Sequence, residues 1–428
     1  MAPETRPSRT TESPSAEQLE LLQTEPLTAL MRATWTWDDR ALRRDLADVL
    51  VAARASELQL TTDWADPSWR SWHENHTLTL ASQFVRAVLG SHLLTRDLDG
   101  AEPFFTLAQI PPGIARPALD SASVVAAFGS KSVPRVDLDL DGSLAAVART
   151  AYTAALEGPN GTGRGLADTA LAAGALRSIA GTPEAETLLK EIEAGATATL
   201  AVAERLGTWD PALVRTRAET GDDRTVYLTG EKSVVPYVNG SRTLLVMGRT
   251  TAGPTLYAID PKHSGVAVTT ADSTNPDAPF SGVTLDQVPA TQIGADGTGG
   301  RTMTRLLETA AVVIGAEQVG HAERAIETVA NMTPDNVALP HLIASWAAAS
   351  VLLRDAVEAA DRRADNGQAA AMCHIAAARS SRAATGHALA AVGEHTNEHS
   401  RRDRADALDL VFGGPAASHE RLLERMDI

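Results

Sequence analysis

Residues 225–250 read TVYLTGEKSVVPYVNGSRTLLVMGRT, followed by PTLYAIDPKHSGVAV at 254–268 and SGVTLDQVPATQIG at 281–294. Short runs rich in Val, Leu, Tyr and Thr alternate here with Gly, Pro and Asp, a pattern typical of strands joined by tight turns. Long alanine-rich stretches with helical spacing lie on both sides of this region. The sequence therefore predicts helices, then a small β module, then helices again.

The change in hydrophobic period places the domain boundaries. We expect a disordered leader at 1–16, which is rich in Pro, Ser and Thr, and an N-terminal helical domain at 17–199. A middle β domain, either a small barrel or a sandwich, is predicted at 200–298, and a C-terminal helical bundle at 299–428. The predicted fold class is α+β.

Composition excludes several classes of function. The chain has 428 residues, a net charge of −16 and an isoelectric point near 5.1, so a nucleic-acid backbone would be repelled by its average field. No run approaches the ~18 apolar residues of a membrane span, and the first residues lack the apolar core of a signal peptide. We therefore expect a soluble cytoplasmic protein without membrane partners. The single cysteine, Cys373, lies in an apolar run and is predicted to be a buried, inert thiol.

Two motifs resemble metal sites and fail on their ligands. Residues 137–142 read DLDLDG, like the start of a calcium loop, but the twelfth position of that loop is Ala148 instead of a bidentate Glu. His395 and His399 are four residues apart, as zinc ligands on a helix can be, but no third ligand is evident. A solvated polar helix end is the better interpretation. No metal is predicted.

Three tryptophans, Trp64, Trp69 and Trp72, lie within nine residues of one another. Such a group can line a pocket, but aromatic residues at this spacing more often cover a helix bundle or a neighbouring domain. We expect a structural role.

A combination of segments, taken together, carries a family resemblance. GTPEAETLLKEIEAG at 181–195, LTGEK at 228–232, VTLDQVPATQIG at 283–294 and AAVVIGAEQVGHAERAIE at 310–327 resemble the acyl-CoA dehydrogenase family from about residue 142 to the C-terminus. The resemblance implies an N-terminal helical domain, a middle β domain and a C-terminal four-helix bundle. It also implies FAD as the cofactor and an acyl-CoA or acyl-carrier-protein thioester as the substrate. In that chemistry a carboxylate takes the α-proton while the flavin accepts the β-hydride.

The positions that face the flavin in this family are altered. Ala203 and Glu204 stand where the family has the Thr-Glu of its Thr-Glu-Pro motif, beside the isoalloxazine. Val234 and Pro236 replace an aromatic residue and a Thr or Ser that pack against the flavin. Gly393 belongs to a shortened loop that corresponds to the one near the adenosine. The resemblance therefore gives these five positions as cofactor-binding, with FAD weakly held or lost.

The catalytic base is displaced as well. Gly413 aligns with the usual catalytic glutamate, which leaves Glu398 as the nearest alternative carboxylate in the sequence. Three hypotheses remain open. The chain is an acyl-CoA dehydrogenase-like flavoprotein with an unusual base, a non-catalytic or structural subunit that partners an active paralogue, or a repurposed biosynthetic homologue.

Oligomers are expected through the C-terminal helices. Ala347–Ala360 and Ala369–Ala391 offer faces of small side chains that suit close helix packing. The resemblance implies pairing through the same bundle. A homo-dimer or tetramer, or a hetero-oligomer with a paralogue, is predicted.

Overall fold

The computed structural model describes residues 20–61, 67–110, 128, 138, 140, 143–157, 165–179, 181–204, 210–270, 280–362, 366–393 and 414–428. The chain divides into two compact units, one of residues 1–133 with 427–428 and one of residues 134–426. Helices precede and follow a single block of strands, as the change of hydrophobic period predicted. The limits 17–199, 200–298 and 299–428 stay a prediction.

The first unit is helical. Helices α3 (Arg40–Thr61) and α4 (Pro67–Leu89) pack against each other, and α2 (Thr24–Ala33), α5 (His92–Thr95) and α6 (Glu102–Ala108) pack on α4. Its largest fully buried side chains include Leu27, Met31, Leu46, Leu89 and Leu107.

The tryptophan group is only partly described. Trp72 is buried on α4, and its ring stacks on that of His76 with 5.0 Å between ring centroids. Trp72 therefore has the structural role that was expected. Trp64 and the side chain of Trp69 lie outside the described residues.

In the second unit, helices α8 (Ser143–Glu157), α9 (Leu166–Ser178) and α10 (Pro183–Glu193) precede the strands. Thr182 is the N-cap of α10 and Pro183 its first residue, as predicted, although the Thr182 side chain makes no capping hydrogen bond. After the strands come α11 (Gly299–Met332), α12 (Leu339–Asp361), α13 (Gly367–Val392) and α15 (Gly414–Arg425). No helix within the described ranges combines the length and the apolar character that crossing a bilayer requires.

Helix α11 is the centre of this unit and packs against α8, α12 and α13. Two glycines let its neighbours approach closely. A Cβ on Gly315 would lie 2.7 Å from Sγ of Cys373, and a Cβ on Gly320 would lie 2.6 Å from the backbone oxygen of Tyr152. Cys373 is fully enclosed on α13, and burial raises the pKa of its thiol. It is therefore the inert thiol that the sequence predicted.

The alanine faces are used inside the chain. Many of them are at most 3 % exposed in the packing of α11, α12 and α13, among them Ala349, Ala356, Ala370, Ala371, Ala377, Ala384 and Ala388. Small side chains bring these helices together within one protomer. The composition of the faces thus gives no separate support for pairing between chains, and the oligomer stays a prediction.

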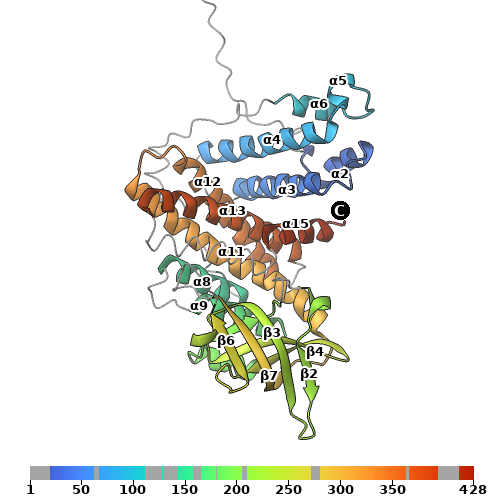
Figure 1. Ribbon diagram of the computed structural model, residues 1–428. Helices are drawn as coiled ribbons and strands as arrows, with labels where there is room; N and C mark the ends of the chain where they lie inside the picture. Colours follow the sequence, from blue (N-terminus) through green and yellow to red (C-terminus); the bar gives the residue numbers. More distant parts are fainter. Residues whose placement is uncertain are drawn as a thin grey trace, which may run out of the picture. The chain divides into compact units, whose positions relative to one another are not determined.

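Seven strands within the described residues form one sheet, whose order closes on itself (Figure 1). The strands are β1 (Ala198–Ala201), β2 (Arg217–Thr220), β3 (Val226–Pro236), β4 (Thr243–Thr250), β5 (Gly253–Ile259), β6 (Val266–Thr270) and β7 (Phe280–Ile293). Neighbours run from β4 through β2, β3, β7 and β5 back to β4, so these five strands make a small barrel. β1 lies parallel to β4, and β6 is antiparallel to β7. Inward-facing side chains fill the barrel, including Leu228, Val235, Leu244, Val246, Tyr257, Val283 and Leu285.

A candidate site at the ends of strands β1 and β3

Four of the five predicted cofactor-binding positions lie where β1 and the residues that follow it run beside the last residues of β3. Here the backbone N–H of Ser233 donates to the carbonyl oxygen of Ala203 at 2.9 Å. Four residues before Ala203, Oγ1 of Thr199 donates to the carbonyl oxygen of Pro236 at 2.8 Å. The structure therefore brings together the segments that hold Ala203, Glu204, Val234 and Pro236, which are about thirty residues apart in the sequence.

The other predicted positions are elsewhere. Gly393 caps the C-terminal end of helix α13 with a φ of 80°, a conformation that favours glycine. Glu398, Gly413, His395 and His399 lie outside the described residues. In the part of the chain that is described, no group of three or more His, Cys, Asp and Glu side chains could hold a metal ion.

Strand β3 contains a bulge beside the residues that follow β1. Lys232 pairs with Val283 and Val235 with Ser281, so β3 carries one residue more than β7 in this interval. Val234, in the bulge, has a φ of 54°, which is strained for a β-branched residue. The bulge brings Ser233 against β1, where its Oγ donates to the carbonyl oxygen of Glu204 at 2.5 Å.

The carboxylate of Glu204 is held in a buried polar network. It accepts hydrogen bonds from the backbone N–H groups of Arg215 at 2.8 Å and Thr216 at 2.9 Å, and from Oγ1 of Thr216 at 2.8 Å. Nζ of Lys232 lies 2.8 Å from the same carboxylate and 3.3 Å from the carbonyl oxygen of Val202. The side chain of Lys232 is fully enclosed, and that of Glu204 is only 11 % exposed.

Burial and pairing act in opposite directions on this pair. Burial lowers the pKa of Lys232 from its ordinary 10.5 to about 8, against the opposing effect of the Glu204 charge. Burial alone would raise the pKa of Glu204, but the ammonium of Lys232 and the hydrogen bonds from Thr216 outweigh it and leave that pKa below its usual value. At neutral pH both groups are therefore charged, and Glu204 acts as a satisfied structural carboxylate.

The side chains at the four predicted positions offer a flavin no hydrogen-bond donor. Ala203 and Pro236 are buried and Val234 is partly buried, and none of these side chains can donate a hydrogen bond. The carboxylate of Glu204 is engaged by four donor groups from its own chain. An isoalloxazine has an apolar ring end and a polar edge that needs hydrogen-bond donors. None of these four side chains supplies a donor for that polar edge. They do not fit a tightly held flavin.

Three residues of the site were missed by sequence reasoning, namely Lys232, Ser233 and Thr216. One signal pointed to Lys232. It lies four residues after Leu228 in a strand, and both side chains are buried in the structure. A lysine at an inward position of a strand requires a buried acceptor, and Glu204 is that acceptor. Thr216 and Ser233 gave no comparable signal.

Comparison with known proteins gives no match to a family model and none to a curated protein. Solved structures do match. Butyryl-CoA dehydrogenase from Megasphaera elsdenii superposes with a TM-score of 0.59 over 85% of this chain and 99% of that one, at 16% identity. A steroid ACAD superposes with a TM-score of 0.54 over 94% and 98%, at 19% identity. The chain has the acyl-CoA dehydrogenase fold. The sequence-based resemblance and the predicted α+β fold class are thereby confirmed.

A similar fold also occurs in a protein that was solved with a small molecule other than an acyl thioester. PigA, solved with FAD and proline, superposes with a TM-score of 0.52 over 73% of this chain and 98% of its own, at 14% identity. A fold can serve several functions, so the acyl-CoA dehydrogenase fold by itself does not set the substrate of this chain.

Proposed function

We propose that this chain serves in the α,β-desaturation of an acyl thioester, carried by coenzyme A or by an acyl carrier protein, as a subunit of the acyl-CoA dehydrogenase type. One observation carries the proposal. Within this fold, the segments that correspond to the flavin-facing motifs of the family meet at the ends of β1 and β3. FAD, when bound, supplies the acceptor for the β-hydride of the thioester.

The chain by itself holds FAD weakly in this proposal. Glu204 is engaged by Lys232 and Thr216, and Ala203 and Val234 cannot donate a hydrogen bond from their side chains. Each missing neutral hydrogen bond is worth about 0.5–1.5 kcal/mol. Several such losses together lower affinity by powers of ten, although these contributions are not strictly additive.

A second candidate function is that of a non-catalytic subunit beside an active paralogue, which then supplies flavin and base. The inward position of the Glu204 carboxylate favours it, because this residue serves the barrel instead of a ligand. Assembly with a paralogue, or as a homo-dimer or tetramer, is part of the proposal and is measured by light scattering. If the chain is a monomer at micromolar concentration, both alone and with the paralogue, the proposed assembly is contradicted.

The two candidates are separated by an activity measurement. The protein is assayed alone with added FAD and an artificial electron acceptor on acyl-CoA and acyl-carrier-protein thioesters, and again after co-expression with a paralogue whose flavin motifs are intact. Activity of the chain alone that falls about 10²-fold or more in Glu398→Gln, but not in Glu394→Gln, assigns the base to Glu398. Activity only in the co-expressed complex, unchanged by Glu398→Gln, assigns the chemistry to the partner. Inactivity in every arm would contradict the proposal.

A further inference from the structure

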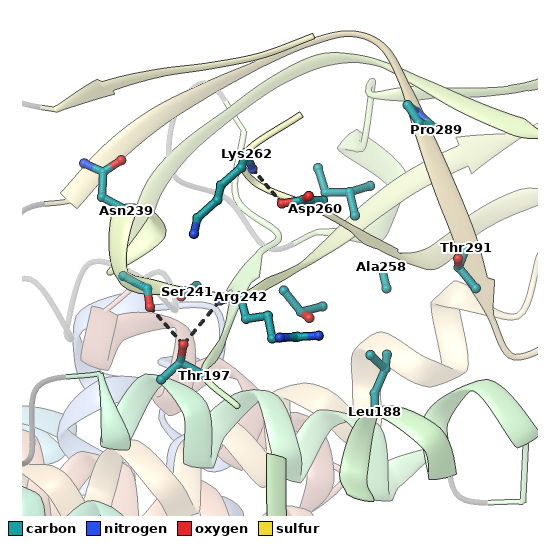
Figure 2. A pocket seen from close by; sticks show the side chains of 13 residues that line it. Leu188, Thr197, Asn239, Ser241, Arg242, Ala258, Asp260, Lys262, Pro289 and Thr291 are labelled. Atoms are coloured by element: carbon teal, nitrogen blue, oxygen red, sulfur yellow. Dashed lines mark hydrogen bonds between the residues drawn. The ribbon is translucent and has the colours of Figure 1, made fainter. Parts of the chain in front are cut away.

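A pocket of about 760 Å³ opens at the other end of β1 (Figure 2). Thr197, directly before β1, lines it, whereas Glu204 lies beyond the opposite end of the strand. The pocket is enclosed by helix α10, the turn before β4, the end of β5 and the middle of β7. None of the residues that line it belongs to the candidate site at the ends of β1 and β3.

Its rim carries two cationic side chains. Lys262 comes from the turn after β5, and Arg242 from the turn before β4. The ammonium of Lys262 makes neither a hydrogen bond nor an ion pair with any described residue, and its side chain extends over the pocket (Figure 2). In a chain with a net charge of −16, two exposed cations at one pocket are a local exception to the average field.

Two carboxylates lie close by and reduce the positive potential of the rim, but neither forms an ion pair with Lys262. Asp260 accepts the backbone N–H of Lys262 at 2.8 Å, which holds its carboxylate in the turn. Glu191 is 3.9 Å from Nε of Arg242, and their side chains are 44 % and 72 % exposed. An exposed pair at that distance is weak, so the guanidinium donors of Arg242 remain available to another anion.

The pocket also has apolar lining residues. Leu188 on α10, Ala258 on β5 and Pro289 on β7 line it, and Leu188 points from its helix towards the strands (Figure 2). Apolar side chains beside cationic donors suit a molecule that has a compact apolar body and an oxyanion head. Arginine and lysine bind phosphate and carboxylate oxygens through charge-assisted hydrogen bonds.

We propose that this pocket binds a small organic oxyanion, with its phosphate or carboxylate head between Arg242 and Lys262 and its apolar body against Leu188, Ala258 and Pro289. The site does not depend on flavin. The binding proposal can be true or false independently of the proposed desaturation, because none of the pocket residues belongs to the hydrogen-bonded group around Glu204 and Lys232.

Isothermal titration calorimetry on the full chain tests the proposal with four probes, namely benzyl phosphate, phenylacetate, inorganic phosphate and benzyl alcohol. We expect benzyl phosphate to bind about tenfold more tightly than inorganic phosphate, because its ring buries apolar surface, and to weaken as salt rises. Phenylacetate that binds as tightly as benzyl phosphate identifies a carboxylate ligand, and weaker binding identifies a phosphate. Benzyl alcohol binding as tightly as either anion would overturn the proposal, since charge would then play no part.

Three variants assign the binding to the pocket. Lys262→Gln should weaken benzyl phosphate binding about three- to tenfold, and Glu191→Gln should tighten it about twofold by removing a competing carboxylate. Lys190→Gln removes the same charge from an exposed lysine of α10 outside the pocket lining, and should leave the affinity unchanged. Equal effects of Lys262→Gln and Lys190→Gln, or no saturable binding of either anion, would overturn the proposal.

Discussion

At the scale of single residues, the buried pair of Lys232 and Glu204 is the feature with the largest expected effect on stability. Lys232→Met leaves the Glu204 carboxylate buried without its counter-charge, so we expect the free energy of unfolding to fall by about 3–5 kcal/mol. Lys190→Met, on an exposed surface, should change it by less than about 0.5 kcal/mol. Chemical denaturation measures both. A loss below about 1 kcal/mol in Lys232→Met would show that the pair is not buried as described.

The same lysine predicts a pH dependence with a definite sign. Its pKa is about 8 in the folded chain and near the ordinary 10.5 in the unfolded chain. Between these values the unfolded chain binds more protons than the folded chain, so this group makes the free energy of unfolding rise with pH. Denaturation at several pH values should show this rise between pH 8 and 10.5 in the difference between the native protein and Lys232→Met. A flat or falling difference would contradict it.

Two neighbouring valines in β3 should respond differently to substitution by glycine. Val234 has a φ of 54° and is only partly buried, so Val234→Gly relieves backbone strain while it removes little buried surface. Val235 is fully buried in the barrel. We expect Val234→Gly to change the free energy of unfolding by less than about 1 kcal/mol, and Val235→Gly to lower it by about 3 kcal/mol. Equal losses of unfolding free energy in the two variants would contradict the bulge at Val234.

At the scale of elements, helix α11 contains two glycines in opposite surroundings. A Cβ on Gly320 would lie 2.6 Å from the backbone oxygen of Tyr152 on α8, whereas a Cβ on Gly300 meets nothing within 4 Å. Gly320→Ala should therefore lower the free energy of unfolding by about 1–3 kcal/mol through overpacking. Gly300→Ala should leave it unchanged or raise it by up to about 1 kcal/mol, because alanine restricts the unfolded chain. Thermal denaturation of both variants decides, and a stabilised Gly320→Ala would contradict the close approach of the helices.

The elements were largely predictable from the sequence, because long helices and alternating strands each leave a period in the hydrophobic residues. The start of α10 followed from Thr182 and Pro183. The bulge at Val234 was not predictable, since a β-branched residue at positive φ opposes the local preference and is imposed by packing. The partner of Lys232 was equally hidden, because Glu204 is 28 residues away and no local pattern joins the two.

At the scale of the whole molecule, the fold is that of the acyl-CoA dehydrogenases, whereas the side chains of the candidate site do not fit a tightly held flavin. The acyl-CoA dehydrogenase fold follows from the order of helices and barrel, and it was visible in the sequence as a set of scattered segments. From Ala203, Val234 and Pro236 the sequence predicted that FAD is weakly held or lost, and this stays a proposal. The use of Glu204 as a structural carboxylate required the structure. The chain thus has a fold that flavoproteins share, while Glu204 and its partners stabilise the barrel.

The most direct test of this account is the ratio of FAD to protein after gel filtration of the chain expressed alone. We expect well under one FAD per chain, falling further on dilution, because none of the four strand-end side chains provides a donor for the polar edge of the flavin. One FAD per chain that stays bound at nanomolar protein would contradict the account, and would show that other parts of the chain replace the missing contacts.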